Sequence, residues 1–283
     1  MQKEANIEQN KSHYDNQYQR INIDRIADVL NNRDSYLEGA TKTDISWVGM
    51  YYGNLEQRLS GKKVLELGCG DCFNVAIMAS LGAKVYANDI SDRSGEIIKA
   101  LNKRFEFNYP IDFISGDITH ANFTEHNFDY VIGKAFLHHL TLQHEEQVLK
   151  VSSSILKATG EARFFEPAIN SKLLDEIRWA IPIKDRPSKL FSPKKFKQWE
   201  ESDPHPHRDN SSKHFKTMGA NYFDEISIIP LGVLERFYRL MPSTKDKNGA
   251  FKRRALKLEK YLPGFMRYTG ARSQTIIYKK PKG

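Results

Sequence analysis

The stretch Val64-Leu-Glu-Leu-Gly-Cys-Gly-Asp-Cys72 decides the fold. Its apolar start predicts a short buried strand, and Gly68 and Gly70 follow that strand directly. A helical pattern begins at Asn74. A strand that passes through two glycines into a helix brings the backbone close to a ligand, and the ligand then lies at the carboxyl end of the strand.

Strands and helices alternate along the chain after this loop. The pattern predicts helices over 74–81, 93–105, 144–156 and 173–181. It predicts strands over 64–67, 83–88, 111–114, 128–132, 161–165, 225–229 and 273–278. Strands separated by helices of this length favour an α/β protein with a parallel sheet, right-handed crossovers and helices on both faces.

Three segments interrupt or precede the alternation. Residues 1–60 are polar and predict two or three helices that lead into the fold. Residues 169–218 combine a helical run with Pro, Lys and His, and the basic helical stretch 231–262 follows the sixth strand. We therefore expect one domain over 61–283 with insertions at about 169–218 and 231–268, of which the first shapes a substrate pocket.

The composition is that of a soluble globular protein. Of 283 residues, 40% are hydrophobic and 28% are charged, which excludes disorder over the whole length. The longest apolar runs, such as 226–234, are far shorter than the roughly 20 residues of a membrane-spanning helix. The amino-terminal residues contain no apolar signal core, and only two cysteines occur, so a cytoplasmic location is expected.

The positive charge is concentrated near the end of the chain. The formal net charge is +8, but residues 243–283 contain twelve Lys and Arg and two acidic residues. The remainder of the chain is therefore slightly acidic. A basic segment of this kind suits nucleic acid, an anionic membrane surface or an acidic substrate, and it also suits a plain solvated helix face.

Two kinds of nucleotide ligand compete for the glycine loop. A dinucleotide fingerprint requires a third glycine or alanine at the sixth position of Gly-x-Gly-x-x-Gly, where it permits close helix packing. That position is Phe73. NAD or FAD is therefore disfavoured.

Several separated segments resemble the class I S-adenosylmethionine-dependent methyltransferases, in particular bacterial small-molecule enzymes with Leu-His-His-Leu and Glu-Pro motifs. The matching segments are Glu66-Leu-Gly-Cys-Gly70, Tyr86-Ala-Asn-Asp-Ile90, Gly116-Asp-Ile118, the Phe128 to Leu140 segment ending in Leu-His-His-Leu, and Leu156 to Pro167. The sequence departs from the family at Cys72, where a third glycine is usual, and at Ala158 and Thr159 in a turn. The resemblance implies a Rossmann-like, doubly wound, seven-stranded, mostly parallel sheet with a helical amino-terminal lid and a cap insertion.

The resemblance also implies the cofactor, S-adenosylmethionine. In the family, the glycine loop wraps the methionine part of the cofactor with Glu66 toward its ammonium, the acid matching Asp89 accepts both ribose hydroxyls, and the acid matching Asp117 accepts the adenine amino group. An alternative role for Asp89 and Asp117 is to cap the helices that follow them. The implied cofactor-binding residues are Tyr14, Glu66, Leu67, Gly68, Cys69, Gly70, Asn88, Asp89, Ile90, Asp117, Ile118, Lys134 and Ala135.

The candidate catalytic residues are His139, His138 and Glu166. Methyl transfer from a sulfonium is an in-line displacement, so the protein mainly aligns the acceptor and excludes water. A base is needed only where the acceptor loses a proton, and we favour a histidine for that role. Either histidine also suits a packing role at a strand end. Tyr14 resembles the lid tyrosine of such enzymes, or is an aromatic residue on a packing helix.

The acceptor is expected to be a small molecule or a lipid-like molecule, methylated on oxygen or nitrogen. The segment Gly133-Lys-Ala-Phe136 lacks the Pro-Pro-aromatic pattern of enzymes that methylate base amino groups, and no appended nucleic-acid recognition motif is visible. Two alternatives remain open: an RNA or protein methyltransferase that uses the basic carboxyl-terminal segment, and a cofactor-binding module without catalysis.

No metal site is expected. Cys69 and Cys72 have the spacing of a redox or zinc pair, but no second cysteine pair exists and both lie inside the glycine loop. A looser cluster of Asp203, His205, His207 and His214 falls in a proline-rich stretch that is typical of a loop.

Overall fold

A computed structural model describes residues 7, 8, 10–12, 14, 15, 18, 21–120, 124–181, 186–201, 206–240 and 245–282, without the side chains of 239, 240 and 245–247. The strands are β1 (Lys63–Leu67), β2 (Lys84–Asp89), β3 (Asp112–Ser115), β4 (Phe128–Lys134), β5 (Leu156–Pro167), β6 (Phe223–Leu231) and β7 (Ser273–Pro281). The α-helices are α2 (Ile23–Asn31), α3 (Arg33–Thr43), α4 (Ile45–Met50), α5 (Phe73–Ser80), α6 (Asp92–Arg104), α7 (Leu142–Ile155), α8 (Lys172–Ala180), α9 (Pro193–Glu201), α10 (Ser212–Gly219), α11 (Lys245–Leu258) and α12 (Gly264–Gly270). The short 3₁₀ helices are η1 (Leu55–Arg58), η2 (Leu137–His139), η3 (Glu235–Leu240) and η4 (Glu259–Tyr261).

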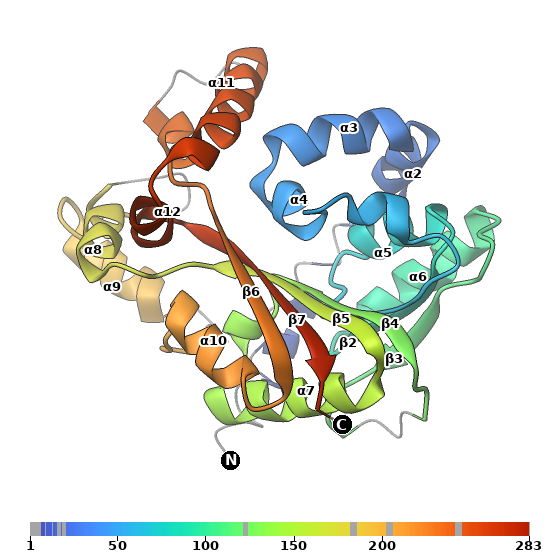
Figure 1. Ribbon diagram of the computed structural model, residues 1–283. Helices are drawn as coiled ribbons and strands as arrows, with labels where there is room; N and C mark the ends of the chain where they lie inside the picture. Colours follow the sequence, from blue (N-terminus) through green and yellow to red (C-terminus); the bar gives the residue numbers. More distant parts are fainter. Residues whose placement is uncertain are drawn as a thin grey trace.

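The strands form one seven-stranded sheet in the order β3-β2-β1-β4-β5-β7-β6 (Figure 1). The first five strands in this order pair in parallel, and β7 runs antiparallel between β5 and β6. This arrangement confirms the predicted Rossmann-like, mostly parallel α/β fold. It also brings the carboxyl ends of β1, β2 and β4 to one edge of the sheet.

Apolar strands give the sheet a buried core on each face. One core cluster joins the sheet to α2–α6, and it contains Ile26, Trp47, Val75 and Ile97. The other joins the sheet to α7 and α10, and Val148 and Phe215 belong to it. Strands covered on both faces read as nearly continuous apolar runs, as β1 does.

The amino-terminal helices belong to the folded body of the protein. Arg163 of β5 is buried, and it donates hydrogen bonds to the carbonyl oxygens of Met50, the last residue of α4, and of Tyr52 just beyond it. Its guanidinium also pairs with the buried carboxylate of Glu161. The packing of α2–α4 therefore depends on the sheet itself. Whether residues 1–60 act as a lid stays a prediction.

Both insertions leave the same edge of the sheet. Pro167 at the end of β5 and Leu231 at the end of β6 both pair with Ser273 at the start of β7. The first insertion contains α8, α9 and α10, and the second contains η3, α11, η4 and α12. None of the helices that the structure describes is long and apolar enough to cross a membrane.

Strand β5 is longer than the sequence pattern predicts. Ala158 and Thr159, which the sequence places in a turn, lie within β5, and α7 ends at Ile155. The register between β4 and β5 shifts between Phe128 and Tyr130, which accommodates the extra residues. The difference is confined to the amino-terminal end of β5, away from the edge that carries the glycine loop.

Candidate functional site

A cavity of about 350 Å³ lies at the carboxyl ends of β1, β2 and β4. Its wall includes these sequence-predicted residues: Tyr14, Glu66, Gly68, Cys69, Gly70, Asn88, Asp89, Ile90, Asp117, Ile118, Lys134, Ala135 and His139. It also includes residues that were not among the predicted site residues: Ile7, Asn10, Tyr18, Ile21, Asp71, Asn74, Gly116, Phe136, Leu140 and His144. The fold thus gathers five separated segments around one space.

The glycine loop between β1 and α5 has a left-handed backbone. Gly68 and Gly70 have φ angles of +64° and +54°. A Cβ on Gly68 would lie 2.5 Å from the Phe136 ring, and one on Gly70 would lie 2.9 Å from the Tyr18 hydroxyl. Cys72 also has a positive φ, of 58°, at the position where the resembling family uses glycine. The loop is therefore shaped for close approach of a ligand.

Glu66 presents a buried carboxyl group to the cavity. Its Oε1 accepts a hydrogen bond of 2.8 Å from Asn74, whereas its buried Oε2 has no partner among the described residues. Burial raises the pKa of Glu66 to about 8, and the Asn74 hydrogen bond and the Lys134 charge partly oppose this effect. An unpaired buried oxygen of this kind is a place for a ligand donor.

Asp89, at the end of β2, holds the glycine loop in place. Its Oδ2 accepts the Gly70 amide at 2.8 Å, and its Oδ1 accepts the Ser91 amide at 2.9 Å, just before α6. Burial raises the pKa of Asp89, and these two amide hydrogen bonds lower it in turn. Each oxygen keeps further acceptor capacity for a ligand hydroxyl. Asp89 does not cap α6, because Ser91 is the N-cap residue and no side-chain cap hydrogen bond forms there.

Asp117 meets a histidine that the sequence did not mark. Its Oδ1 lies 3.0 Å from Nε2 of His144 and accepts the Thr119 amide at 2.9 Å. His144 is in the first turn of α7, where the Thr141 hydroxyl accepts its amide hydrogen. The start of α7 and the loop after β3 are therefore joined at the cavity wall.

His139 and Tyr14 contact each other in the cavity wall. The Tyr14 hydroxyl lies 3.4 Å from both ring nitrogens of His139, and the two rings meet edge to face with centroids 5.5 Å apart. Nearby, the Lys134 ammonium lies 5.2 Å from the centre of the Trp47 ring. A half-buried imidazole beside a phenol can accept or donate a proton at either nitrogen.

Leu67, His138 and Glu166 lie outside the cavity wall. The Leu67 side chain packs in the core on the α7 face of the sheet. Glu166 has no exposed surface, and its carboxylate accepts the amide hydrogens of Phe136, Leu137 and His138. His138 Nδ1 lies 2.6 Å from Glu166 Oε2. A catalytic role for His138 and Glu166 stays a prediction; in this geometry Glu166 binds the backbone amides of η2 and the His138 ring.

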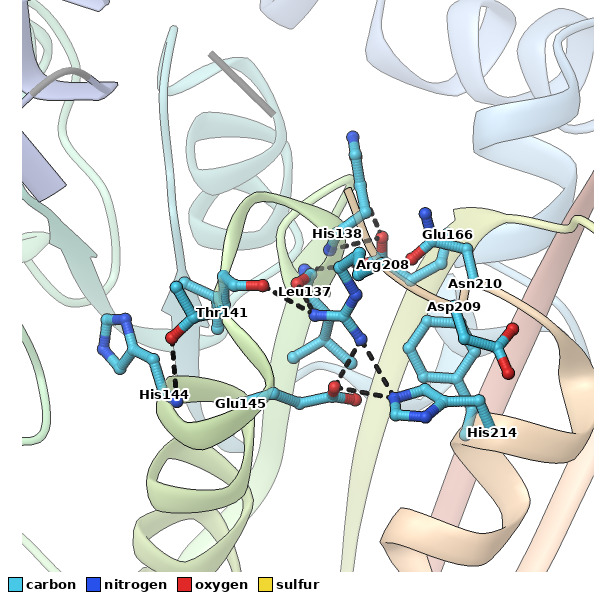
Figure 2. A network of polar contacts seen from close by, with 12 residues as sticks. Leu137, His138, Thr141, His144, Glu145, Glu166, Arg208, Asp209, Asn210 and His214 are labelled. Atoms are coloured by element: carbon cyan, nitrogen blue, oxygen red, sulfur yellow. Dashed lines mark hydrogen bonds and ion pairs between the residues drawn. The ribbon is translucent and has the colours of Figure 1, made fainter. Parts of the chain in front are cut away.

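Arg208 also binds the η2 segment, through backbone carbonyl oxygens (Figure 2). This residue precedes α10, and its guanidinium donates to the carbonyl oxygens of Leu137 and Leu140 at 2.7 and 2.9 Å. It also pairs with the buried carboxylate of Glu145, which lies 2.9 Å from His214 Nε2. The segment that carries His139 is thus fixed through its amides by Glu166 and through its carbonyls by Arg208.

Nothing in the described part of the chain groups three or more His, Cys, Asp or Glu side chains in a way that suits a metal ion. The Cys69 and Cys72 sulfur atoms are 4.0 Å apart and buried, and burial raises the pKa of both thiols. Of the looser cluster, His214 is committed to Glu145, whereas Asp203 and His205 lie outside the described residues.

Comparisons with known proteins agree with this geometry. Residues 64–160 match the model of a family described as "Methyltransferase domain". The fold is similar to that of the PH0226 protein from Pyrococcus horikoshii OT3, with 19% identity, a TM-score of 0.51, and coverage of 88% of this chain and 99% of the other. A SAM-dependent methyltransferase from Archaeoglobus fulgidus has 17% identity and a TM-score of 0.51, with coverage of 87% and 99%. No curated protein matches the sequence.

Proposed function

We propose that the protein, a class I methyltransferase with its methyltransferase domain over residues 64–160, transfers a methyl group from S-adenosylmethionine to an oxygen or nitrogen of a small-molecule or lipid-like acceptor. The observation that supports this proposal is the cavity in which His139 and Tyr14 share one wall with Glu66, Asp89 and the glycine loop.

The cavity residues fit this cofactor. The partnerless Oε2 of Glu66 suits an ammonium group, and the Asp89 carboxylate has acceptor capacity left for hydroxyl groups. Positions 68 and 70 require glycine, because a side chain at either would clash with Phe136 or Tyr18 in the same cavity wall. The part of the wall beyond β2 is lined by Ile90, Asp117 and Ile118, which would hold the adenine ring of the cofactor.

The chain's own part in the reaction is mostly positioning. When bound, S-adenosylmethionine supplies a methyl group that is already activated by a positively charged sulfur. The protein aligns an acceptor atom and excludes water, which together are worth several kcal/mol of the barrier. His139 takes the proton of a hydroxyl acceptor at a ring nitrogen, and the Tyr14 hydroxyl at 3.4 Å orients that ring.

Labelled methyl transfer tests this proposal. The protein is incubated with methyl-labelled S-adenosylmethionine and, separately, with small-molecule extract, extracted lipid, RNA and protein. We expect label in the small-molecule or lipid fraction. His139→Ala should lower turnover at least tenfold while cofactor affinity changes little, and His126→Ala, an exposed histidine far from the cavity, is the matched control.

Two outcomes contradict the proposed reaction, and a third contradicts the role given to His139. Label only in RNA or protein would assign the acceptor to a macromolecule. Tight cofactor binding with no label in any fraction would indicate a cofactor-binding module without catalysis. Equal losses of turnover and cofactor affinity in His139→Ala would show that this histidine is a packing residue.

A further inference from the structure

Large apolar side chains that are exposed gather in the two insertions. Among the residues that the structure describes, only Tyr52, Tyr109 and Leu142 of this kind lie elsewhere. The first insertion exposes Leu173, Ile177, Ile181, Leu190 and Phe191, and the second exposes Phe237, Leu258, Tyr261, Phe265, Met266 and Tyr268. Exposed apolar side chains that cluster in this way mark an interaction surface.

The two insertions meet at one end of the molecule. Both leave the edge of the sheet where β5 and β6 end. The Asn170 side chain, before α8, donates to the Tyr268 carbonyl of α12 at 2.8 Å, and the Tyr268 hydroxyl donates to Ile228 of β6 at 3.1 Å. Figure 1 shows α8 and α12 beside each other at this end.

In the second insertion, exposed apolar side chains lie beside basic ones from the end of α11 through η4 into α12. Tyr261 is 80% exposed and Phe265 is 73% exposed. We call the following residues the docking surface: Lys257, Leu258, Lys260, Tyr261, Phe265, Met266 and Arg267. It combines apolar and cationic side chains, as do segments that lie in a membrane interface.

The positive charge here is not balanced by acids. Residues 231–268 contain ten Lys and Arg but three acidic residues. Glu235 pairs with Arg272, and Glu259 accepts the amides of Gly232 and Leu234, so both carboxylates are committed inside the protein. Within the described ranges, Lys257, Lys260 and Arg267 form no ion pair.

A second cavity, of about 520 Å³, opens beside the docking surface between α3, β6, α11 and α12. Apolar side chains line it, among them Val48, Ile229 and Leu256. Lys257, Lys260 and Arg267 of the docking surface also line it, together with Arg253. Apolar walls beside cationic groups suit an anionic amphiphile.

We propose that the docking surface binds the face of an anionic phospholipid bilayer, with Tyr261 and Phe265 entering the headgroup region. Charge complementarity favours this partner over a second copy of the chain, because two such surfaces would repel each other. The aliphatic members Leu258 and Met266 favour lipid over RNA, because single-stranded RNA binds through stacking on aromatic rings. This inference does not depend on the proposed methyl transfer.

Vesicle flotation of the full-length protein without cofactor tests the proposal. We expect co-flotation with phosphatidylcholine vesicles that contain phosphatidylserine, weak binding to phosphatidylcholine alone, and loss of binding as salt is raised. Each basic residue near an anionic bilayer contributes about fivefold to partitioning. Lys257→Glu with Lys260→Glu should therefore lower partitioning at least about 25-fold, whereas Lys99→Glu with Lys103→Glu on α6 makes the same charge change elsewhere.

Two variants that replace an exposed aromatic side chain by serine complete the test. Phe265→Ser should lower partitioning about tenfold, and Tyr109→Ser, an exposed aromatic between α6 and β3, should leave it unchanged. These side chains are exposed, so folding is retained, and circular dichroism checks this. Binding that ignores anionic lipid, or equal losses in target and control variants, would overturn the proposal. So would salt-dependent RNA binding without vesicle binding, or a dimer that Phe265→Ser dissociates.

Discussion

Two carboxylates in the cavity wall, Glu66 and Asp89, are both buried but differ in how their oxygens are paired. Asp89 accepts two amide hydrogens, whereas one oxygen of Glu66 has no partner among the described residues. A buried carboxylate that is short of donors prefers its proton, which is why burial raises the pKa of Glu66 to about 8. The two acids therefore respond differently to pH and to substitution.

Glu66 should make cofactor binding release protons. At about pH 7 the free protein holds Glu66 mostly protonated, and a bound ammonium group favours its charged form, so affinity rises with pH toward 8. Above that, the ligand's own amino group, with a pKa of about 8, loses its charge and affinity falls again. Calorimetry in buffers of different ionisation enthalpy measures the protons released.

Glu66→Gln is the matched control for this measurement. It keeps the shape and the Asn74 contact but has no proton to lose, so proton release at about pH 7 should disappear and only the ligand's own titration should remain. Equal proton release by both proteins would show that another group titrates.

The free energy of unfolding of the free protein should also fall as pH rises from about 4.5 to about 8. The raised pKa of Glu66 means that the folded state binds a proton in this range that the unfolded state has lost.

Asp89→Asn should weaken cofactor binding by about 2 kcal/mol or more, roughly 30-fold. The asparagine offers one oxygen where the carboxylate offers two, so it cannot hold the Gly70 and Ser91 amides and also accept ligand hydroxyls. Titration calorimetry measures the change, with the exposed Asp112→Asn on β3 as control. An unchanged affinity would contradict the role given to Asp89.

At the scale of elements, η2 is held between β5 and the loop before α10. The Arg208 side chain is 1% exposed and that of Glu145 is fully buried. Removing one charge therefore leaves the other buried without its partner. Arg208→Met should lower the free energy of unfolding by about 3–5 kcal/mol. Urea denaturation measures it, and Arg208→Met combined with Glu145→Met should cost clearly less than the single change. A double variant as unstable as the sum of its parts would show that the pair is not coupled.

The elements themselves were largely predictable from the sequence, and the contacts between them were not. The alternation of apolar runs and helical patterns predicts every strand, and the loop at Gly68 and Gly70 predicts where the cavity lies. Nothing local marks Arg208, because its partner Glu145 lies 63 residues earlier. The same holds for Tyr18, which contacts the glycine loop although it lies 52 residues before Gly70 in the sequence. Sequence patterns indicate the periodicity of helices and strands, whereas contacts between residues far apart in the sequence, such as those of Arg208 and Tyr18, form only in the folded protein.

At the scale of the whole molecule, the described residues before α2 behave differently from the helices that follow. Tyr14 and Tyr18 line the cavity, and Lys11 pairs with Asp92 at 3.0 Å, but the core clusters contain nothing earlier than Ile21. The described residues before α2 thus line the cavity and do not belong to the core clusters. The larger part of the expected lid, α2–α4, packs into the core instead.

Deletion of residues 1–20 should therefore weaken cofactor binding about tenfold or more and leave the melting temperature of the free protein within a few degrees. The cavity loses the side chains that exclude water from it, whereas the core keeps its contacts. Calorimetric affinity and thermal unfolding measure the two effects. A large drop in melting temperature together with lost binding would show that the segment is part of the core.

The position of β7 between β5 and β6 also bears on biosynthesis. During synthesis from the amino terminus, β5, the first insertion, β6 and the second insertion all emerge before β7, the strand that lies between β5 and β6 in the sheet. Until then β5 has an open edge, which is a template for pairing with other chains. The nascent protein thus passes through a stage in which its most apolar surface segments are already made but its sheet is incomplete, and the last strand ends that stage by closing the gap.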